Sequence, residues 1–291
     1  MPQPNFLYVG PDKAGSSWLH EVLLAHPQVF MPEAKDLYFF DRYYDRGLSW
    51  YLGLFSPAGP QHRVVGEVCQ DYLFDPRAAG RIEESLGSGV RTMVTLRDPA
   101  DRAWSSYLYA LKQGEQHGTF LEALDEPGLR LIEHGRYATS LAPYLERFGR
   151  ANVHIAVFDD LVADPQRFLD ELLVFLRIDP LVLTPAQLAA QLPAGKARSV
   201  LLARAARKAS DLARARGAAN VIGRVKRSPF VQKALYTPLA DGKPVMGEAE
   251  REAVQRALAA EVAELDRLFG LRLAERWGWQ TAVAAVSGGR S

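Results

Sequence analysis

A short stretch rich in glycine and serine, residues 10–17, has the composition of a phosphate-binding loop. It reads GPDKAGSS, follows the apolar run FLYV and precedes a stretch with helical periodicity. Where a strand turns into a helix, backbone N–H groups and the positive end of the helix dipole favour the binding of a phosphate. The stretch therefore predicts a phosphate site at residues 10–17.

The loop has nearly the spacing of a Walker A motif but lacks the lysine of that motif in its usual place. The pattern G-x-x-x-x-G-K-[ST] has a lysine directly after its second glycine, where this chain has Ser16. The lysine of this loop, Lys13, precedes Gly15 by two positions instead. The spacing disfavours a loop that grips the β- and γ-phosphates of ATP with Mg²⁺, and it favours a single 5'-phosphate that carries a leaving group.

A second anion site is indicated by Arg97 and Ser105, which are eight residues apart. Arg97 follows an apolar run, and Ser105 falls in the second turn of the helix that comes next. A guanidinium offers a planar fork of donors and a serine offers a hydroxyl, so together they can clamp a phosphate. The alternatives are a salt bridge from Arg97 to Asp98 or Asp101 and a surface position for Ser105. Neither alternative explains the pair.

These residues need a scaffold that brings strand ends and helix starts together. Apolar runs of strand type alternate with helical periodicity along the chain, at Phe6–Val9, Val64–Val68, Thr92–Leu96 and Val153–Phe158. Such alternation is typical of βαβ units. We therefore expect an α/β, P-loop-type three-layer fold with a central parallel sheet flanked by helices.

Two of the helices are indicated by their ends. The first is predicted over Ser16–Ala25 and stops before His26, because a residue that precedes proline resists helical geometry. Another begins at Asp98, a preferred N-cap residue with Pro99 at the first helical position, and runs to about Lys112.

The segment Gln28–Arg63, between the first two predicted strands, is crowded with aromatic residues. An insertion after the first βα unit lies beside the carboxyl ends of the strands, where α/β folds bind their ligands. We expect residues 28–63 to form the acceptor pocket, while several of the rings cover the sheet.

The C-terminal third is predicted to be helical. Residues 196–227 hold ten basic residues and one acidic residue, Asp211, which indicates a solvated helix face with an anion-binding rim at its start. A further helix is predicted over Gly247–Phe269, where apolar residues recur three or four apart. We interpret residues 1–291 as a single domain with a helical C-terminal part at 196–291.

The composition excludes several classes of protein. The formal net charge of +1, from 35 Lys and Arg against 34 Asp and Glu, provides no global field for nucleic acid or an anionic membrane. The single cysteine, Cys69, excludes an internal disulfide and fits a reducing compartment. The chain begins without a signal-peptide pattern, and no apolar run approaches the ~20 residues that span a bilayer. We therefore expect a cytoplasmic protein without membrane insertion.

At four places the sequence resembles sulfotransferases that use 3'-phosphoadenosine 5'-phosphosulfate (PAPS). GPDKAGSSWL resembles their 5'-phosphosulfate-binding loop, and LRDPADRAWSSY is similar to their 3'-phosphate-binding segment. KDLYFFD resembles the K-E-x-x-F-F-D segment of the heparan sulfate sulfotransferases. GRYATSLAPYLERFG, with the strand and helix that follow it, also resembles that branch. The likeness runs in order from Asn5 to about Ile178.

The resemblance implies an enzyme that transfers a sulfuryl group from PAPS to a hydroxyl or amine by in-line displacement. It further implies that adenosine 3',5'-bisphosphate is the product, that no metal is needed, and that the acceptor is a saccharide, another small molecule or a natural product. The residues implied to bind the donor are Lys13, Ala14, Gly15, Ser16, Ser17, Trp18, Arg97, Ser105, Lys196 and Arg198. Among them, Lys13 would counter the charge that grows on the leaving phosphate, whereas Arg97 and Ser105 would hold the 3'-phosphate.

Attack by a hydroxyl needs a base, and two carboxylates are candidates. Asp36 occupies the base position of the family, and Glu67 follows as the alternative at the end of the second predicted strand. The histidines left open for this role are His20, His26 and His62. The residues expected to contact the acceptor are Lys35, Tyr38, Phe39 and Phe40.

The chain departs from the family pattern in places. Asp36 stands where Glu is usual, Val68 stands where some members have Lys, and Gly195–Ser199 only approximates the C-terminal nucleotide-binding loop. Two rival functions stay open: a P-loop nucleotide or small-molecule kinase, with Met93–Asp98 as its Walker B segment, and a nucleotide-binding relative without catalysis. The identity of the acceptor, the choice between O- and N-sulfation and the oligomeric state are open as well.

Overall fold

The computed structural model describes residues 2–113, 115, 117–189, 195–197, 236–238 and 244–288. Contacts between Cα atoms group the chain into two compact units. Unit 1 comprises the described residues of Met1–Leu96 and Pro143–Asp241, and unit 2 comprises those of Arg97–Ala142 and Gly242–Ser291. That the chain is a single domain stays a prediction.

Unit 1 is built on a parallel sheet with the strand order β2-β3-β1-β4-β5. The strands are β1 (Phe6–Gly10), β2 (Val29–Phe30), β3 (Val64–Val68), β4 (Arg91–Leu96) and β5 (Val153–Val157). Every residue of β1 and β3 is buried, as expected for strands covered on both faces. The predicted α/β fold with a central parallel sheet is confirmed. The sequence does not predict β2, because two residues are too short to show an alternating pattern.

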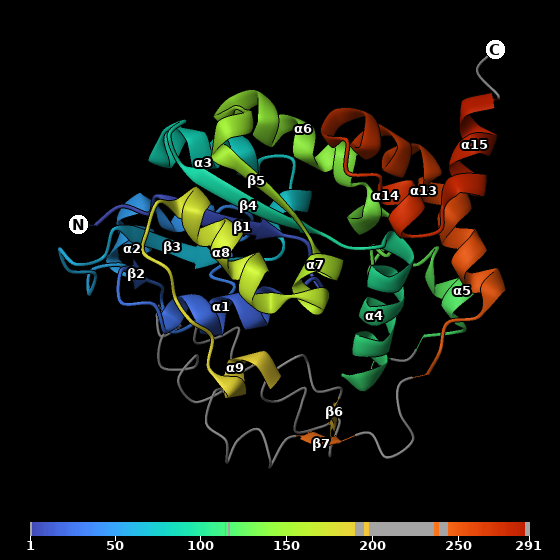
Figure 1. Ribbon diagram of the computed structural model, residues 1–291, viewed down its shortest axis with the longest axis horizontal. Helices are drawn as coiled ribbons and strands as arrows, with labels where there is room; N and C mark the ends of the chain where they lie inside the picture. The colour runs from blue at the N-terminus through green and yellow to red at the C-terminus, as the bar shows by residue number, and fades with distance from the viewer. Residues whose placement is uncertain are drawn as a thin grey trace. The chain divides into compact units, whose positions relative to one another are not determined.

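Helices cover the sheet of unit 1 on both faces (Figure 1). The helices described in this unit are α1 (Ser16–Leu24), α2 (Leu48–Gly53), α3 (Ala78–Leu86), α7 (Phe158–Ala163), α8 (Pro165–Leu176) and α9 (Pro185–Ala189), with 3-10 turns η1 (Tyr44–Arg46), η2 (Tyr72–Phe74) and η4 (Arg150–Asn152). Apolar side chains of α1 and α8 form one core with Phe6 and Tyr8 of β1 and with Val64 and Val68 of β3. Because side chains alternate along a strand, Glu67 of β3 projects toward the opposite face.

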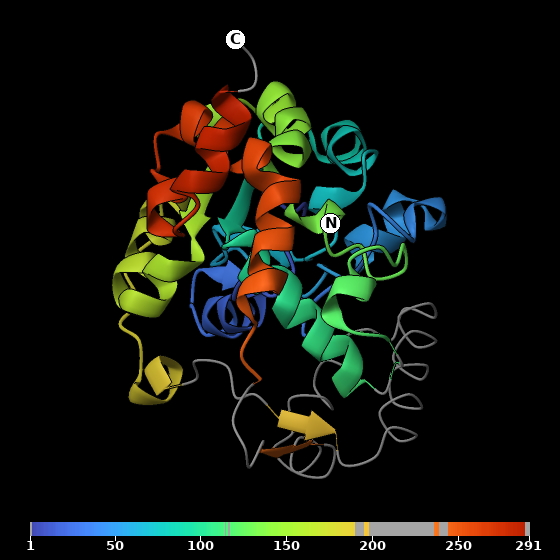
Figure 2. The same cartoon turned by 90° about the vertical axis from the view of Figure 1, so that its right-hand side faces the viewer.

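Unit 2 is helical. Its elements are α4 (Pro99–Lys112), α5 (Phe120–Ala123), η3 (Glu133–Gly135), α13 (Glu248–Phe269), α14 (Leu273–Arg276) and α15 (Gln280–Gly288). The long helix α13 packs against α4, α5, α14 and α15 (Figure 2) and buries Val254, Leu258 and Val262. The helix α6 (Tyr137–Phe148) continues from unit 2 into unit 1.

The predicted element boundaries agree closely with the structure. The predicted helix Ser16–Ala25 is α1, with Ala25 as its C-cap, and the helix predicted from Asp98 is α4. Most of the predicted basic helix at 196–227 lies outside the described residues. At its start, residues 195–197 form the strand β6 (Gly195–Ala197), which pairs antiparallel with β7 (Tyr236–Pro238). Among the helices that the structure describes, none is long and apolar enough to cross a membrane.

Candidate active site

Both glycines of the phosphate loop have a positive φ and lie close to other atoms of the chain. Gly10 ends β1 with φ +139, and a Cβ atom there would lie 2.7 Å from the carbonyl oxygen of Gln70. Gly15 has φ +88, and its Cβ would lie 2.6 Å from Cδ2 of Leu161. Only glycine adopts these conformations without strain and without a clash. The loop is therefore held in a tight turn between β1 and α1.

The first turn of α1 follows this loop directly. Gly15 is the N-cap residue of α1, and no side chain caps it. The first N–H groups of a helix lack partners within the helix, and an anion satisfies them together with the helix dipole. Lys13, two residues earlier, has φ +61, a left-handed conformation that is uncommon for residues other than glycine and often marks functional sites. These features fit the 5'-phosphate of a nucleotide.

Lys35 connects the loop to the candidate base. Its Nζ atom donates a hydrogen bond of 2.9 Å to Ser16 Oγ and another of 3.3 Å to Gln70 Oε1, and it lies 3.3 Å from Asp36 Oδ2. The sequence predicts Lys35 as a contact of the acceptor, and the structure adds these links. The carboxylate of Asp36 is therefore held at the edge of the phosphate loop.

Asp36 is fixed by the backbone that follows β3. Its N–H donates to the carbonyl of Val68 at 2.8 Å, and its Oδ1 accepts from the N–H of Gln70 at 3.2 Å. The residue is 7% exposed and has φ +60. A buried carboxylate with two partners, on a residue whose backbone is also hydrogen-bonded, is held in one orientation, as a general base requires.

Glu67, the alternative base, lies in a different environment. Its Oε1 accepts from Tyr51 Oη at 2.7 Å and from Tyr72 Oη at 3.0 Å, while its buried Oε2 has no hydrogen-bond partner among the residues that the structure describes. Burial raises the pKa of Glu67 to about 8, against the smaller opposing effect of the two tyrosine hydrogen bonds. At neutral pH this raised pKa favours the neutral, protonated carboxyl, which is a poor proton acceptor.

The aromatic residues of the KDLYFFD segment surround these tyrosines. Phe39 and Phe40 are 0% exposed. The ring of Phe39 stacks on the ring of Tyr51 with 4.4 Å between centroids. The backbone N–H of Phe39 donates a hydrogen bond to Tyr72 Oη at 2.8 Å. Tyr38 is half-buried, with the guanidinium of Arg42 at 3.9 Å from its ring centroid. Phe39 and Phe40 thus hold the tyrosines that bind Glu67, and their contact with an acceptor stays a prediction.

The remaining loop residues differ in exposure. Ala14 and Ser16 are buried, whereas Ser17 is exposed. Trp18 packs edge-on against Phe168 and donates from Nε1 to the carbonyl of Gln187 at 3.0 Å, so it belongs to the core that supports the loop. The histidines are engaged in structural contacts: His20 bonds the carbonyl of Pro32, His26 that of Asp179, and His62 packs on Phe30.

In unit 2, Arg97 and Ser105 lie at the start of α4. Asp98 caps this helix by accepting from the N–H of Ala100 at 2.8 Å. Arg251 of α13 pairs with Asp98 at 2.7 Å and with Asp101. Arg251 thus pairs with both carboxylates that the sequence offers as partners of Arg97, and the charges of Asp101 and Asp98 also act on Arg97. Burial lowers the pKa of Arg97, and Ser105 is half-buried.

The last two predicted donor-binding residues receive no structural account. Lys196 belongs to β6, of which only the backbone is described, and Arg198 lies outside the described residues. Sequence reasoning missed four residues of the network: Gln70, Tyr51, Tyr72 and Arg251. The position of Gln70 just after the end of a predicted strand is a signal that points to the ligand edge. Nothing in the sequence pairs the other three with their partners.

The chain matches the sulfotransferase domain family over residues 3–189. It is 28% identical over 187 residues to heparan sulfate glucosamine 3-O-sulfotransferase 3A1 of Mus musculus, a match that covers 62% of this chain and 47% of that protein. It is 30% identical over 111 residues to membrane-associated sulfotransferase kil1 of Dictyostelium discoideum, covering 38% of this chain and 23% of that protein. The chain thus spans less than half the length of these relatives.

A solved structure shares the fold. The sulfotransferase from Alicyclobacillus acidocaldarius superposes with a TM-score of 0.68 at 22% identity, over 96% of this chain and 100% of that chain. At this level of identity the likeness concerns the fold.

Proposed function

Because the chain belongs to the sulfotransferase domain family, we propose that it transfers a sulfuryl group from PAPS to a hydroxyl or amine of a saccharide or small-molecule acceptor. The observation that carries the proposal is the bridge made by Lys35, which contacts Ser16 of the phosphate loop and Asp36 at once. A phosphate cradle and a carboxylate held beside it are the two parts that an in-line transfer to a hydroxyl needs.

The loop fits the 5'-phosphate end of PAPS. Its two glycines let the loop pack closely on Gln70 and Leu161, and no side chain caps α1. When bound, PAPS supplies the activated sulfuryl group. The N–H groups of Gly15, Ser16 and Ser17 bind the 5'-phosphate, and Lys13 counters the negative charge that develops on it as its bond to sulfur breaks.

Asp36 is the general base in this proposal. It takes the proton of the acceptor hydroxyl while the oxygen of that hydroxyl forms its bond to sulfur, and the electron pair of the broken bond stays on the 5'-phosphate. Its raised pKa makes Glu67 the weaker candidate for this role at neutral pH. It instead orients Tyr51 and Tyr72 through hydrogen bonds, and their rings pack on Phe39 and Phe40 of the segment 28–63 that we propose to form the acceptor pocket.

Arg97 and Ser105 are proposed to recognise the 3'-phosphate, which distinguishes PAPS from ATP. A guanidinium fork and a hydroxyl suit the oxygens of a phosphate. Lys196 and Arg198 are proposed to close over the same group.

We further propose that the reaction needs no metal and that the enzyme works in the cytoplasm. The support is that Lys13 supplies the charge that a metal would otherwise provide, and that the single cysteine fits a reducing compartment. Transfer activity that persists in excess EDTA tests the first part, and fractionation of the source cells tests the second.

Titration calorimetry distinguishes the proposal from its rivals. Adenosine 3',5'-bisphosphate is expected to bind more tightly than AMP, and more tightly than ATP with Mg²⁺, and Lys13→Ala is expected to abolish most of this binding. A preference for ATP would contradict the proposal and favour a kinase. Tight binding of the bisphosphate without transfer from labelled PAPS to any sugar, phenol or amine would favour a relative without catalysis.

Arg97→Ala tests the second phosphate site by itself. Loss of one charge-assisted contact is expected to weaken the bisphosphate about tenfold or more and to leave AMP nearly unchanged. Equal losses for both nucleotides would contradict a role at the 3'-phosphate. Arg136→Ala, a substitution outside the proposed site, serves as the matched control.

A further inference from the structure

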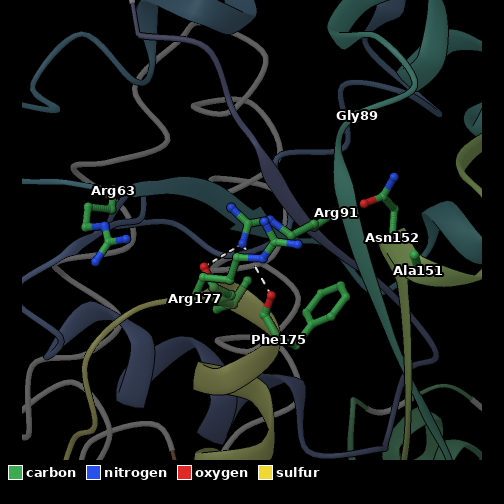
Figure 3. A pocket seen from close by; sticks show the side chains of 8 residues that line it. Arg63, Gly89, Arg91, Ala151, Asn152, Phe175 and Arg177 are labelled. Atoms are coloured by element: carbon green, nitrogen blue, oxygen red, sulfur yellow. Dashed lines mark hydrogen bonds between the residues drawn. The ribbon is translucent and has the colours of Figure 1, made fainter.

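A pocket opens at the edge of the sheet opposite the phosphate loop (Figure 3). Its residues come from the amino ends of three strands: Arg63 precedes β3, Arg91 begins β4, and Asn152 precedes β5. The phosphate loop follows the carboxyl end of β1. In a parallel sheet all amino ends share one edge, so the pocket and the loop lie at opposite edges. The pocket measures about 350 Å³, which is the size of a small-molecule site.

Three arginines give the pocket its charge. Arg63, Arg91 and Arg177 line it, and no acidic side chain is among its described lining residues. None of the three forms a salt bridge with another described residue. Their charge is therefore not neutralised within the described part of the chain.

Arg91 is held in place by the end of α8. Its Nη1 donates to the carbonyls of Phe175 at 3.3 Å and Leu176 at 2.5 Å (Figure 3). Its Nε and Nη2 form no hydrogen bond with described residues. Capping the helix thus uses one nitrogen of the guanidinium and leaves a fixed set of donors for another partner.

Arg177 occupies a position where glycine is the usual residue. It is the C-cap of α8 with φ 57 and ψ 44, the left-handed conformation that commonly ends a helix with glycine or asparagine. An arginine here places a second guanidinium beside Arg91 (Figure 3). Burial and the nearby charges of Arg177 and Arg63 lower the pKa of Arg91. Helix capping accounts for Arg91 alone, whereas an anion would relieve the repulsion among all three.

We propose that this pocket binds a small organic sulfate or phosphate ester through the guanidinium groups of Arg63, Arg91 and Arg177. Guanidinium forks match the oxygens of these tetrahedral anions. The ring of Phe175, a half-buried lining residue stacked on His154 with 5.0 Å between centroids, offers an apolar surface to the organic part. The site is separate from the phosphate loop and does not depend on the function proposed for that loop.

The test is a titration of the full chain followed by backbone amide NMR shifts, with glucose 6-sulfate, glucose 6-phosphate and glucose as probes. Both esters are expected to shift the amides of Gly89, Ala151 and Arg177 without shifting residues 10–17, and glucose is expected to have no effect. The ester with the lower Kd identifies the class of anion that the pocket prefers.

Two exposed substitutions localise the binding. Arg177→Gln and Arg63→Gln are each expected to raise the Kd about tenfold, the loss of one charge-assisted hydrogen bond. Arg167→Gln is the control, because Arg167 lies on the exposed surface of α8, the helix that Arg177 ends. It is expected to leave the Kd unchanged. Circular dichroism checks that each variant is folded, and two different substitutions keep the test decisive if one of them unfolds.

Three results would overturn the proposal: no binding of either ester, shifts confined to residues 10–17, or a Kd that neither substitution changes.

Discussion

The Nζ atom of Lys35 donates a hydrogen bond of 2.9 Å to Ser16 Oγ, so a single side chain ties the phosphate loop to the segment that carries Asp36. The same atom lies 3.3 Å from Asp36 Oδ2. The sequence indicates both segments separately, but it does not show that Lys35 joins them. We infer that Lys35 positions the base relative to the donor.

Lys35→Met is expected to lower kcat/KM by about tenfold to a hundredfold, because charge-assisted hydrogen bonds to Ser16 and Gln70 are lost together with the ion pair to Asp36. Steady-state kinetics with PAPS would measure this effect. Lys35→Arg should recover part of the activity. Lys112→Met, a loss of charge outside the proposed site, serves as the control. A kcat/KM within twofold of the unchanged chain would rule out the positioning role.

Because the carboxyl of Glu67 is buried, we expect the free energy of unfolding to depend on pH. Its pKa is raised from 4.5 to about 8 by burial, so between these values the folded chain holds a proton that the unfolded chain releases. The stability contributed by this protonated group is present below pH 4.5 and is lost as pH rises through 8. Glu67→Gln removes the effect, since an amide stays neutral.

Urea unfolding at pH 6 and pH 9 provides the measurement. From pH 6 to pH 9, the unchanged chain is expected to lose roughly 3 kcal/mol more of its free energy of unfolding than Glu67→Gln. All other titrating groups are common to both proteins and cancel in the comparison. Equal losses in the two proteins would show that the pKa of Glu67 is not raised.

Local signals in the sequence predict the elements well. Val64–Val68 is predicted as a strand and is β3, because an apolar run that ends before polar residues needs no distant partner to be recognised. The start of α4 follows from Asp98 and Pro99, two neighbours whose effect on the helix is local. The glycines of the phosphate loop are equally readable from the sequence.

Contacts between distant segments are not predictable in this way. Tyr51 and Tyr72 converge on Glu67 from two different elements, and the aromatic composition of 28–63 does not say which rings are buried. Arg251 reaches Asp98 from 153 positions away. Such pairs depend on the packing of helices and strands, which periodicity alone does not specify.

We expect two arginines of α13, Arg251 and Arg256, to contribute differently to the free energy of unfolding. Arg251→Met leaves the buried carboxylate of Asp98 without its cation, so the free energy of unfolding should fall by about 2 kcal/mol. Arg256→Met, which breaks an exposed pair with Glu252 on the same helix, should have little effect. Urea unfolding of both variants measures the difference. Equal effects would mean that the pair with Asp98 contributes no more than a surface ion pair.

Gly15→Ala tests the cradle of the phosphate loop. The new Cβ would lie 2.6 Å from Cδ2 of Leu161 at φ +88, so stability should fall by about 1–3 kcal/mol and nucleotide affinity should fall with it. Gly270→Ala is the control, because Gly270 has a similar left-handed conformation, with φ 64 and ψ 27, but a Cβ there meets nothing within 4 Å, so it reports the conformational strain alone. Urea unfolding and calorimetry measure the two effects. A loss no larger than that of Gly270→Ala would show that Leu161 yields to the new methyl group.

The strand order determines when, during synthesis of the chain, the strand before the phosphate loop can pair with its neighbours. β1 pairs with β3 on one side and with β4 on the other, and both neighbours follow it along the chain. On the ribosome, β1 therefore emerges without either of its hydrogen-bonding partners and gains the second one only after Leu96 has been added. Long-range pairing of this kind folds slowly. Until then, the apolar residues of β1 lack the neighbouring strands beside which they are buried in the folded chain.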